Sequence, residues 1–463
     1  MARQDGLVVA ARLDRLPASR TVWFFVVLIS FGAFFEIYDI GLTAVVSPGL
    51  IKAGVFHKGA MGLLGLNDQA SFVAATFLGL WLGSLAFSRI ADRVGRKPIF
   101  AVSLIWYAAA SALMSFQSTA AAVDAWRFVA GLGIGMQIVA IDCYLAELAP
   151  RAIRGRAFAV STFIQFLAVP LGAGLALVVI PHGLGGIDGW RWLGWFPAIG
   201  ALAIWWVQRA LPESPRWLAD HGQAARAEAV LAAIEAKVER ETGRSLPGPE
   251  PQPPLTDAPA TAPASSMWAP PYGRRIAMMS AFHVLQSVGY FGFANWAPTL
   301  LEARGVTITK SLAYTAAIAL SYPLAPILVS AIADRVERKW QIVIGALGAA
   351  ACGLLFAGQS SAGPWIALGV LLSVFNILMS IGFHAYQSEL FPTHFRARAV
   401  GLVYSFSRLS AVVSGYLIAF LLQASGVTAV FAAIAAMLAG AAAIVWFFGP
   451  RTRGRALEEI SPG

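Results

Sequence analysis

The sequence predicts an all-α polytopic membrane protein, with twelve transmembrane helices in two six-helix bundles. Three observations lead to this fold class. The chain of 463 residues is 58% hydrophobic and only 13% charged, whereas soluble domains carry roughly 25% charged residues. Its apolar residues gather in long runs that short basic breaks separate. Two stretches of the first half also recur in the second half at one common offset.

Twelve apolar runs approach or exceed the ~20 helical residues that cross ~30 Å of hydrocarbon. Pro and Gly occur inside several of them, which membrane helices tolerate. The runs lie near 21–47, 70–88, 98–117, 120–142, 157–180, 190–210, 275–301, 311–332, 340–358, 362–386, 399–423 and 425–448. A soluble core would not need so many long runs, so we expect each run to cross the membrane.

The basic residues indicate how the helices are oriented. Nineteen Lys and Arg residues lie on one side of the runs, at Arg3, Arg12, Arg15, Arg20, Arg89, Arg93, Arg96, Lys97, Arg151, Arg154, Arg156, Arg335, Arg338, Lys339, Arg396, Arg398, Arg451, Arg453 and Arg455. The other side has Lys52, Lys58, Arg191, Arg304 and Lys310. By the positive-inside rule, both termini are expected in the cytoplasm, beneath a cell inner membrane. The net charge of +10 therefore reflects topology rather than a nucleic-acid partner.

An internal repeat relates the two halves of the chain. ADRVGRK at 91–97 recurs as ADRVERK at 333–339, and AELAPRAIRGRAFAV at 146–160 aligns with SELFPTHFRARAVGL at 388–402. Both pairs share an offset of 242 residues without a gap. A common register predicts two bundles in the same orientation, a parallel repeat about an axis along the membrane normal.

The repeat and the runs divide the chain into five segments. These are a cytoplasmic N-terminal segment (1–20), an N-terminal bundle (21–210), a cytoplasmic central loop (211–273), a C-terminal bundle (274–448) and a cytoplasmic tail (449–463). The central loop begins as a charged amphipathic helix and continues as a Pro-rich tether that we expect to be disordered. The first apolar run is too long for the core of a cleavable signal peptide, so it is expected to remain as the first helix.

The stretch GSLAFSRIADRVGRKPIF (83–100) resembles the signature loop of the major facilitator superfamily. AELAPRAIRGR and LPESPRWL (211–218) resemble further signatures of its sugar-porter and organic-ion branches, and SELFPTHFRARAVG resembles their second-half counterpart. The resemblance covers the whole chain except the central tether. It implies a monomeric secondary transporter that works by alternating access and uses no cofactor other than the proton gradient as its energy source.

The same resemblance implies a charged latch that closes the cytoplasmic side. Its residues are Asp92, Arg93, Arg96, Lys97, Glu147, Arg156, Asp334, Arg335, Arg338, Glu389 and Arg398. Charges of this kind could pair across the cytoplasmic seam, or could serve only to fix topology. The family's second glycine is Gly95 in the first copy but Glu337 in the second, so the second loop is expected to pack less tightly.

Intramembrane charges that do not repeat are the candidates for proton coupling. A charge at the centre of a membrane helix costs roughly 2.5–3.5 kcal/mol on insertion scales, yet the residues 242 positions after Glu36, Asp39 and Arg127 are uncharged. Asp39 lies about 12 Å from the outer end of the first run, and Arg127 lies at similar depth in the fourth. We expect the two to meet, with Asp39 and, less strongly, Glu36 carrying the proton. The alternative is a static buried ion pair.

Arg408 is the candidate for binding an anionic substrate. It lies about 14 Å into the eleventh run with no acidic residue nearby in sequence, and a guanidinium can hold a carboxylate in a bidentate pair. Organic-anion branches of the family carry a basic residue here, by resemblance. Pairing with a carboxylate or backbone group of another helix is the alternative.

The seventh run presents polar side chains on one face. His283, Gln286 and Tyr290 recur at i, i+3 and i+7, and could line a binding site. The paired-glutamine motif of sugar porters is missing here, and GYFGFANWAPTLL resembles organic-ion and aromatic-acid relatives instead. Packing is the alternative for His283. Gln165, Asn376 and His384 are weaker substrate-binding candidates, for which plain helix–helix hydrogen bonding is the simpler interpretation.

Other chemistry has little support in the sequence. GLGIG (131–135) lies in a membrane run without a preceding strand, so small-residue helix packing explains it better than a dinucleotide site. We find no P-loop, no metal-ligand cluster and no nucleophile–base pair, so an enzyme is not expected. Cys143 and Cys352 are expected to be packing residues.

The sequence therefore predicts a proton symporter of a small organic acid, with an aromatic or pyridine carboxylate as the narrower candidate. A sugar or polyol symporter is the alternative, favoured by PESPRWL and the RGR motif. A non-transporting sensor on the same fold is the alternative from another class, and a signalling phenotype independent of transport would distinguish it.

Overall fold

The protein is described here by a computed structural model, which covers residues 2–57, 67–150, 153–248, 267–333, 336–391 and 396–452. All regular elements in these ranges are helices. The first long helices are α2 (Arg20–Lys52), α3 (Asp68–Val94), α4 (Arg96–Met114), α5 (Ala120–Leu148), α6 (Arg154–Phe166), α7 (Ala168–Val179) and α8 (Gly189–Ala210). The second set is α11 (Tyr272–Ala303), α12 (Ile308–Ala319), α13 (Ser321–Ala333), α14 (Arg338–Ala357), α15 (Ala362–Glu389) and α16 (Arg396–Phe448).

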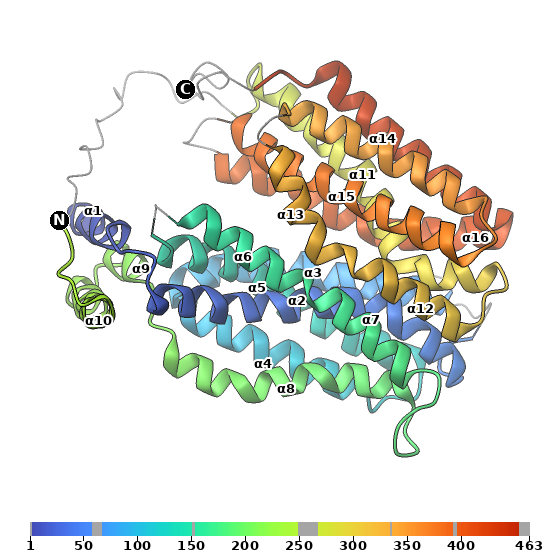
Figure 1. The fold of residues 1–463 in the computed structure, drawn as a ribbon, viewed down its shortest axis with the longest axis horizontal. Coiled ribbons are helices and arrows are strands. Elements are labelled where there is room, and N and C mark those ends of the chain that lie inside the picture. Colours follow the sequence, from blue (N-terminus) through green and yellow to red (C-terminus); the bar gives the residue numbers. More distant parts are fainter. Residues whose placement is uncertain are drawn as a thin grey trace.

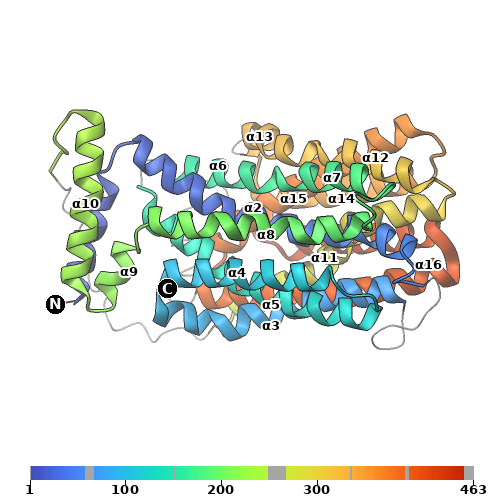
Figure 2. The ribbon, with the colours of Figure 1, turned by 90° about the horizontal axis from the view of Figure 1, so that it is seen from below.

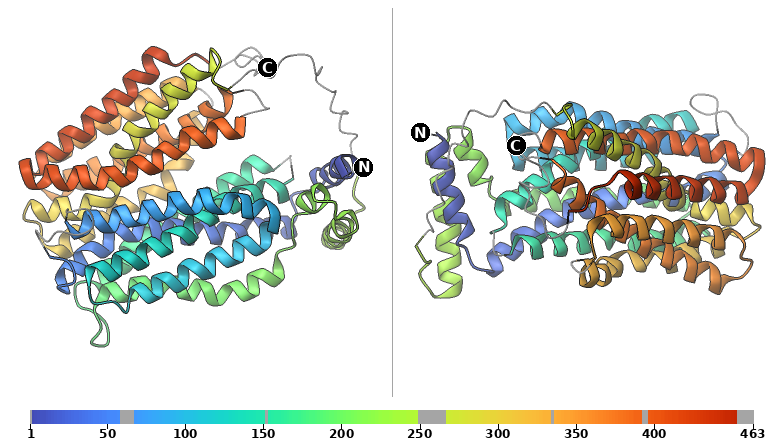
Figure 3. Two further views of the ribbon diagram at one scale, coloured as in Figure 1. Left: turned by 180° about the vertical axis from the view of Figure 1, so that it is seen from behind. Right: turned by 90° about the horizontal axis from the view of Figure 1, so that it is seen from above.

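The two sets of helices form two neighbouring groups. In Figure 1, α2 to α8 lie together below α11 to α16, and the view from behind in Figure 3 shows the same division. Within the described residues, nine helical segments are long and apolar enough to cross a membrane. The runs expected at 157–180 and 311–332 each appear as two consecutive helices, whereas α16 joins the last two runs and is interrupted by Gly426 at a φ of 77°.

Local sequence signals explain where several helices begin. The side-chain oxygens of Ser19, Asn67 and Thr119 accept hydrogen bonds from backbone amides three residues ahead, at the starts of α2, α3 and α5. Such N-caps satisfy amides that have no partner inside the helix. The helix α2 continues through Pro48 to Lys52, five residues beyond the predicted run. Asp39 therefore lies about 20 Å from its outer end rather than 12 Å.

Small residues bring α3 and α5 into backbone contact. A Cβ atom on Gly83 would lie 2.3 Å from the Leu132 carbonyl oxygen, and one on Gly135 would lie 2.2 Å from the Leu80 oxygen. No larger residue fits at this separation, which is the close approach that small residues permit in membranes. The GLGIG stretch thus serves helix packing.

Three helices lie outside the two groups, at the end of the molecule where α2 begins. They are α1 (Ala2–Asp14), α9 (Pro215–Asp220) and α10 (Ala224–Thr242), and Figure 2 shows α10 running crosswise to the long helices. The charged helix of the central loop was predicted and is α10. The helix α1 was not predicted, because the N-terminal segment is too short and too charged for a membrane run, although Val9 and Leu13 stand one helical turn apart. Residues 249–266 of the predicted tether lie outside the described residues.

The two groups contact each other away from the α1 end. Gln69 Nε2 donates to Thr299 Oγ1 over 2.9 Å. The rings of Phe77 and Phe291 are 4.5 Å apart between centroids, and those of Phe166 and Tyr322 are 6.0 Å apart nearer the middle of the helices. Gln69 and Phe77 belong to the first turns of α3, so this seam is packed from the outer end to the middle.

Candidate functional site

Asp39 of α2 and Arg127 of α5 form an ion pair in the interior of the first helix group. Arg127 Nη1 lies 2.7 Å from Asp39 Oδ2, and both side chains have an exposed fraction of 0%. The pair joins residues 88 positions apart in the chain. The sequence predicted that these side chains would meet at similar depth, and the structure brings them together.

Polar neighbours complete the surroundings of this pair. Arg127 Nε donates to Thr76 Oγ1 and Nη2 donates to Thr43 Oγ1, each over 2.9 Å. Arg127 Nη2 also donates to the carbonyl oxygen of Asp39, and Ser111 Oγ donates to Asp39 Oδ1 over 3.0 Å. Thr43, Thr76 and Ser111 were not predicted from the sequence as partners of this ion pair. Thr43 could have been found, because it lies one helical turn from Asp39.

Glu36 differs from Asp39 in its surroundings. It lies three residues earlier on α2 and is half-buried, whereas Asp39 is fully buried. The ion pair with Arg127 is made by Asp39. Glu36 and Asp39 share a predicted helix face but lie in different environments. The buried Asp39 is better placed to control the helix contacts of the closed interior.

A cluster of basic and aromatic side chains lies in the second helix group, around Tyr404. The Arg408 guanidinium carbon is 5.1 Å from the Tyr404 ring centroid, and Nη2 is 3.5 Å from the Tyr404 hydroxyl. The rings of His283 and His384 lie 5.4 and 5.7 Å from the same ring. Phe383 stacks on His384 at 4.3 Å. We call Arg408, Tyr404, His283 and His384 the basic cluster.

The basic cluster has no acidic partner in the part of the chain that the structure describes. Arg408 makes no ion pair there, unlike Arg127. His283 Nε2 instead contacts Gln387 Oε1 at 3.1 Å, and its Nδ1 has no partner among the described residues. Half-exposed Arg408 and exposed His384 are accessible. Positive charge with accessible donors is suited to holding an anion.

The remaining predicted substrate-binding residues are distributed unequally. Gln286 is buried and donates to Ser287 Oγ, while the half-buried Tyr290 ring packs at right angles to Phe291. Gln165 Nε2 contacts Ser161 Oγ at 3.1 Å in the first group. Asn376 is buried, and its Oδ1 has no hydrogen-bond partner among the described residues. None of these four residues belongs to the basic cluster, which contains the predicted candidates His283, His384 and Arg408.

One buried polar residue was missed by the sequence analysis. Gln137 on α5 has an exposed fraction of 0%, and neither side-chain polar atom has a partner within the described ranges. Unpaired buried amides cost free energy and therefore call for a ligand or water. No motif surrounds Gln137, so only its burial identifies it.

The predicted latch charges form pairs within each half. Arg96 Nε lies 3.1 Å from Glu147 Oε1, and Arg338 Nε lies 3.7 Å from Glu389 Oε1. The second pair is the first displaced by 242 residues. Each pair lies within one half, where it joins the start of one helix to the end of its neighbour.

Two further latch residues, Arg156 and Lys97, lie within the described residues. Arg156 is exposed, and the backbone amide of Lys97 donates to Glu213 Oε1 over 3.3 Å. The side chains of Asp92, Arg93, Asp334, Arg335 and Arg398 lie outside the described residues.

The two loop copies differ in backbone conformation at the position of Gly95 and Glu337. Gly95 has a φ of 109°, and a Cβ there would lie 2.5 Å from Glu213 Oε2. Glu337 has a φ of −58°, so the backbone at the matching position of the second copy is different. The PESPR stretch therefore closes over the first loop at a position where only glycine fits.

Comparison with known families identifies the chain. The model of the family described as "Sugar (and other) transporter" matches residues 25–463. This protein belongs to that family of the major facilitator superfamily. It is a multi-pass membrane transporter of metabolites, and its relatives are transporters rather than enzymes.

Several relatives match over nearly the whole length of the transporter. A Bacillus subtilis (strain 168) protein named for metabolite transport, YyaJ, is 31% identical over 96% of both chains. The inner membrane metabolite transport protein YdjE of Escherichia coli (strain K12) is 29% identical over 98% of both. The niacin transporter NiaP of Acinetobacter baylyi is 25% identical over 98% of this chain and 99% of its own.

Solved structures with this fold include the xylose transporter XylE from E. coli. Its inward open conformation matches with a TM-score of 0.71 and 20% identity over 95% of this chain and 99% of that chain. At this identity the match establishes the shared fold alone.

Proposed function

We propose that this transporter is a proton-coupled symporter of a small organic acid, with an aromatic or pyridine carboxylate as the expected substrate class. The contrast between its two intramembrane arginines carries the proposal. Arg127 is neutralised by Asp39 at 2.7 Å, whereas Arg408 contacts Tyr404, whose ring also neighbours two histidines. A charge inside the membrane is costly without a counter-charge, and a substrate carboxylate would supply one.

The aromatic side chains of the basic cluster support an aromatic acid. The ring centroids of Tyr404 and Phe383 lie between 4.3 and 5.7 Å from those of His283 and His384. A flat ring bearing a carboxylate could stack there while its charge meets Arg408. The relative NiaP is named a niacin transporter, and niacin is a pyridine carboxylate.

Asp39 is the proposed proton carrier. While it is ionised it holds Arg127, Ser111 and its own helix in one arrangement. Protonation would remove the charge that Arg127 binds, so the α2–α5 contact would loosen. Proton uptake could thereby be linked to the rearrangement of the helices. Glu36, one turn away, is the secondary candidate.

The proposed architecture has twelve spans in two six-helix bundles related by the 242-residue repeat. The pairs Arg96–Glu147 and Arg338–Glu389 support it, since both positions shift by 242. Tyr144 and Tyr386, also 242 apart, each donate to a proline carbonyl at the end of their own half. We further propose cytoplasmic termini, a monomer, no cofactor, and a cytoplasmic latch made of the charges at the α1 end.

A sugar or polyol symporter is the second candidate. The family description and the fold shared with a xylose transporter favour it. A sugar would hydrogen-bond to groups such as the Gln137 amide and the Asn376 Oδ1, which lack partners in the described ranges. A bound sugar would, however, provide no negative charge to pair with Arg408. A sensor would bind its ligand without moving it.

The deciding experiment uses purified protein in liposomes that contain a pH dye. Carboxylates and sugars are added one at a time outside, and proton entry is recorded. We expect acidification with one carboxylate class, and its loss in Asp39→Asn, which should still exchange labelled for unlabelled substrate.

Arg408→Gln should weaken carboxylate binding roughly 10- to 100-fold, the equivalent of a hydrogen bond between charged groups. Arg408→Lys should restore part of it, because a lysine keeps the charge without the planar fork. Acidification by sugars alone would make the second candidate correct. Ligand binding without any flux would indicate the sensor.

A further inference from the structure

A cavity of about 530 Å³ lies between α10 and the ends of α4 and α8. One wall is the face of α10 that carries Arg226, Val230, Ala233 and Lys237, and the opposite wall contains the start of α4 and residues 209–213. This cavity plays no part in the transport site described above.

The cavity is strongly basic. Its lining contributes four cations, Lys97, Arg209, Arg226 and Lys237, against the single carboxylate of Glu213. That carboxylate accepts hydrogen bonds from the backbone amides of Arg96 at 3.0 Å and Ser214 at 2.9 Å. Its charge is therefore already engaged at the start of α4, and the cavity presents a surplus of positive charge.

Two of these cations, Arg226 and Lys237, have few competing partners. Arg226 Nη1 contacts Gln223 Oε1 at 2.5 Å, and Lys237 Nζ lies 5.8 Å from the Phe24 ring centroid. Within the described ranges, neither makes an ion pair with a carboxylate. Both side chains are exposed, and they stand at i and i+11 on α10 with apolar Val230 and Ile234 between them.

The cavity lies where the apolar surface of the bundle begins. The helices α4 and α8 expose Val102, Ile105 and Ile199 along their outer faces, which suits contact with lipid chains. Lys97 and Pro98 stand at the first turn of α4, and Arg209 in the last turn of α8. A lipid lying against these helices would bring its headgroup to the level of the cavity.

We propose that this cavity binds the phosphate headgroup of an anionic phospholipid from the surrounding leaflet. Phosphate is recognised by Arg and Lys side chains, and basic pockets beside membrane helices hold anionic headgroups. The apolar residues Phe25, Leu211 and Val230 would contact the glycerol and the first carbons of the chains. The bound lipid would join α10 to the ends of α4 and α8.

Native mass spectrometry of the full-length protein in detergent tests this site, with phosphatidylglycerol as the probe. Arg226→Gln/Lys237→Gln should weaken binding roughly thirtyfold, since each basic residue near a lipid surface contributes a factor of about five. The matched control Arg240→Gln/Arg244→Gln removes the same charge from exposed positions that do not line the cavity. It should bind as the parent does.

Equal losses in the two double variants would overturn the site, because they would show a general charge effect. Equally tight binding of phosphatidylcholine would overturn the charge selectivity. Displacement by inorganic phosphate at the concentration of the lipid would overturn the lipid assignment in favour of a free anion. If the first variant lost its thermal unfolding transition, Lys237→Gln against Arg240→Gln would make the same comparison with single changes.

Discussion

At the scale of single residues, the intramembrane charges differ in their burial and in their partners. Asp39 and Arg127 are fully buried and satisfy each other together with Thr43, Thr76 and Ser111. Arg408 has an aromatic partner but no carboxylate in the described part of the chain. The first arrangement is closed and self-sufficient, whereas the second leaves the Arg408 guanidinium accessible.

The buried pair makes a prediction about stability. Arg127→Met should lower the free energy of unfolding by about 3–5 kcal/mol, because removal of one partner leaves a buried carboxylate uncompensated. Adding Asp39→Asn to that variant should recover part of the loss, since the remaining group is then neutral. Thermal unfolding of the purified variants measures both effects. If the double variant were no more stable than Arg127→Met, the two charges would not be coupled.

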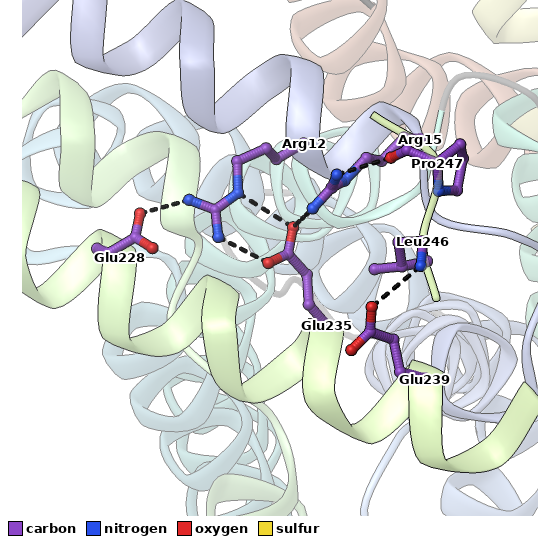
Figure 4. A network of polar contacts seen from close by, with 7 residues as sticks. All are labelled: Arg12, Arg15, Glu228, Glu235, Glu239, Leu246 and Pro247. Carbon is purple, nitrogen blue, oxygen red and sulfur yellow. Dashed lines mark hydrogen bonds and ion pairs between the residues drawn. The ribbon is translucent and has the colours of Figure 1, made fainter. Parts of the chain in front are cut away.

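At the scale of helices, α1 is held on α10 by a network of charges. Arg12 contacts Glu235 through Nη2 at 2.6 Å and Glu228 through Nη1 at 2.6 Å, and Arg15 Nη2 reaches Glu235 at 2.6 Å (Figure 4). Apolar side chains beneath it, including Leu13 and Leu231, are buried in one cluster. The first helix of the chain is thus joined to the central loop, more than 200 residues away.

This network should respond to acid. Burial works to raise the pKa of Glu235, but the hydrogen bonds from Arg12 and Arg15 outweigh it and lower the pKa below the ordinary 4.5. Because the pKa is lower in the docked state, the stabilisation is complete above pH 4.5 and is lost as the pH falls through the lowered pKa. Hydrogen exchange of the α1 amides, corrected for intrinsic rates, should therefore accelerate only in that acid range.

Glu235→Gln should remove this dependence. At pH 7 its α1 amides should exchange about tenfold faster than in the parent, the equivalent of one hydrogen bond to a charged group. The control is Glu239→Gln, because Glu239 accepts from the Leu246 amide rather than from α1. Equal protection in Glu235→Gln and the parent would show that apolar packing alone holds α1.

At the scale of the whole molecule, the two helix groups are joined through the outer seam. The Phe77–Phe291 and Gln69–Thr299 contacts close it on the side away from α1. Under the proposed alternating access, this seam opens in the other conformation. The Gln69–Thr299 hydrogen bond is neutral and the Phe77–Phe291 contact is apolar, so separating these residues leaves no charge unpaired.

A cross-link across the seam should stop transport. A Cβ on Gly415 would lie 3.3 Å from the Val73 Cβ, near the about 3.5–4.5 Å of disulfides. In a background with Cys143 and Cys352 replaced by Ser, Val73→Cys/Gly415→Cys should lose nearly all flux on oxidation and regain it on reduction. The single-cysteine variants are the controls. Undiminished flux in the oxidised, cross-linked protein would mean that the seam does not open.

The sequence by itself determined which segments enter the membrane and which residues are unusual there. Hydropathy and charge bias are local properties, and partition into lipid depends on them directly. Asp39, Arg127 and Arg408 were identified because a charge in an apolar run is costly wherever the helix packs. The family signatures could also be recognised from the sequence, because each is a short continuous stretch of the chain.

The tertiary structure decided which of these residues touch. Asp39 was expected to meet Arg127, but its hydroxyl partners, the contact of His283 with Gln387 and the docking of α1 on α10 were not foreseen. The pairs Arg96–Glu147 and Arg338–Glu389 within each half were not foreseen either. Such contacts depend on the rotation and tilt of helices far apart in the chain, and an apolar run can turn any of its faces toward a neighbour without changing its hydropathy.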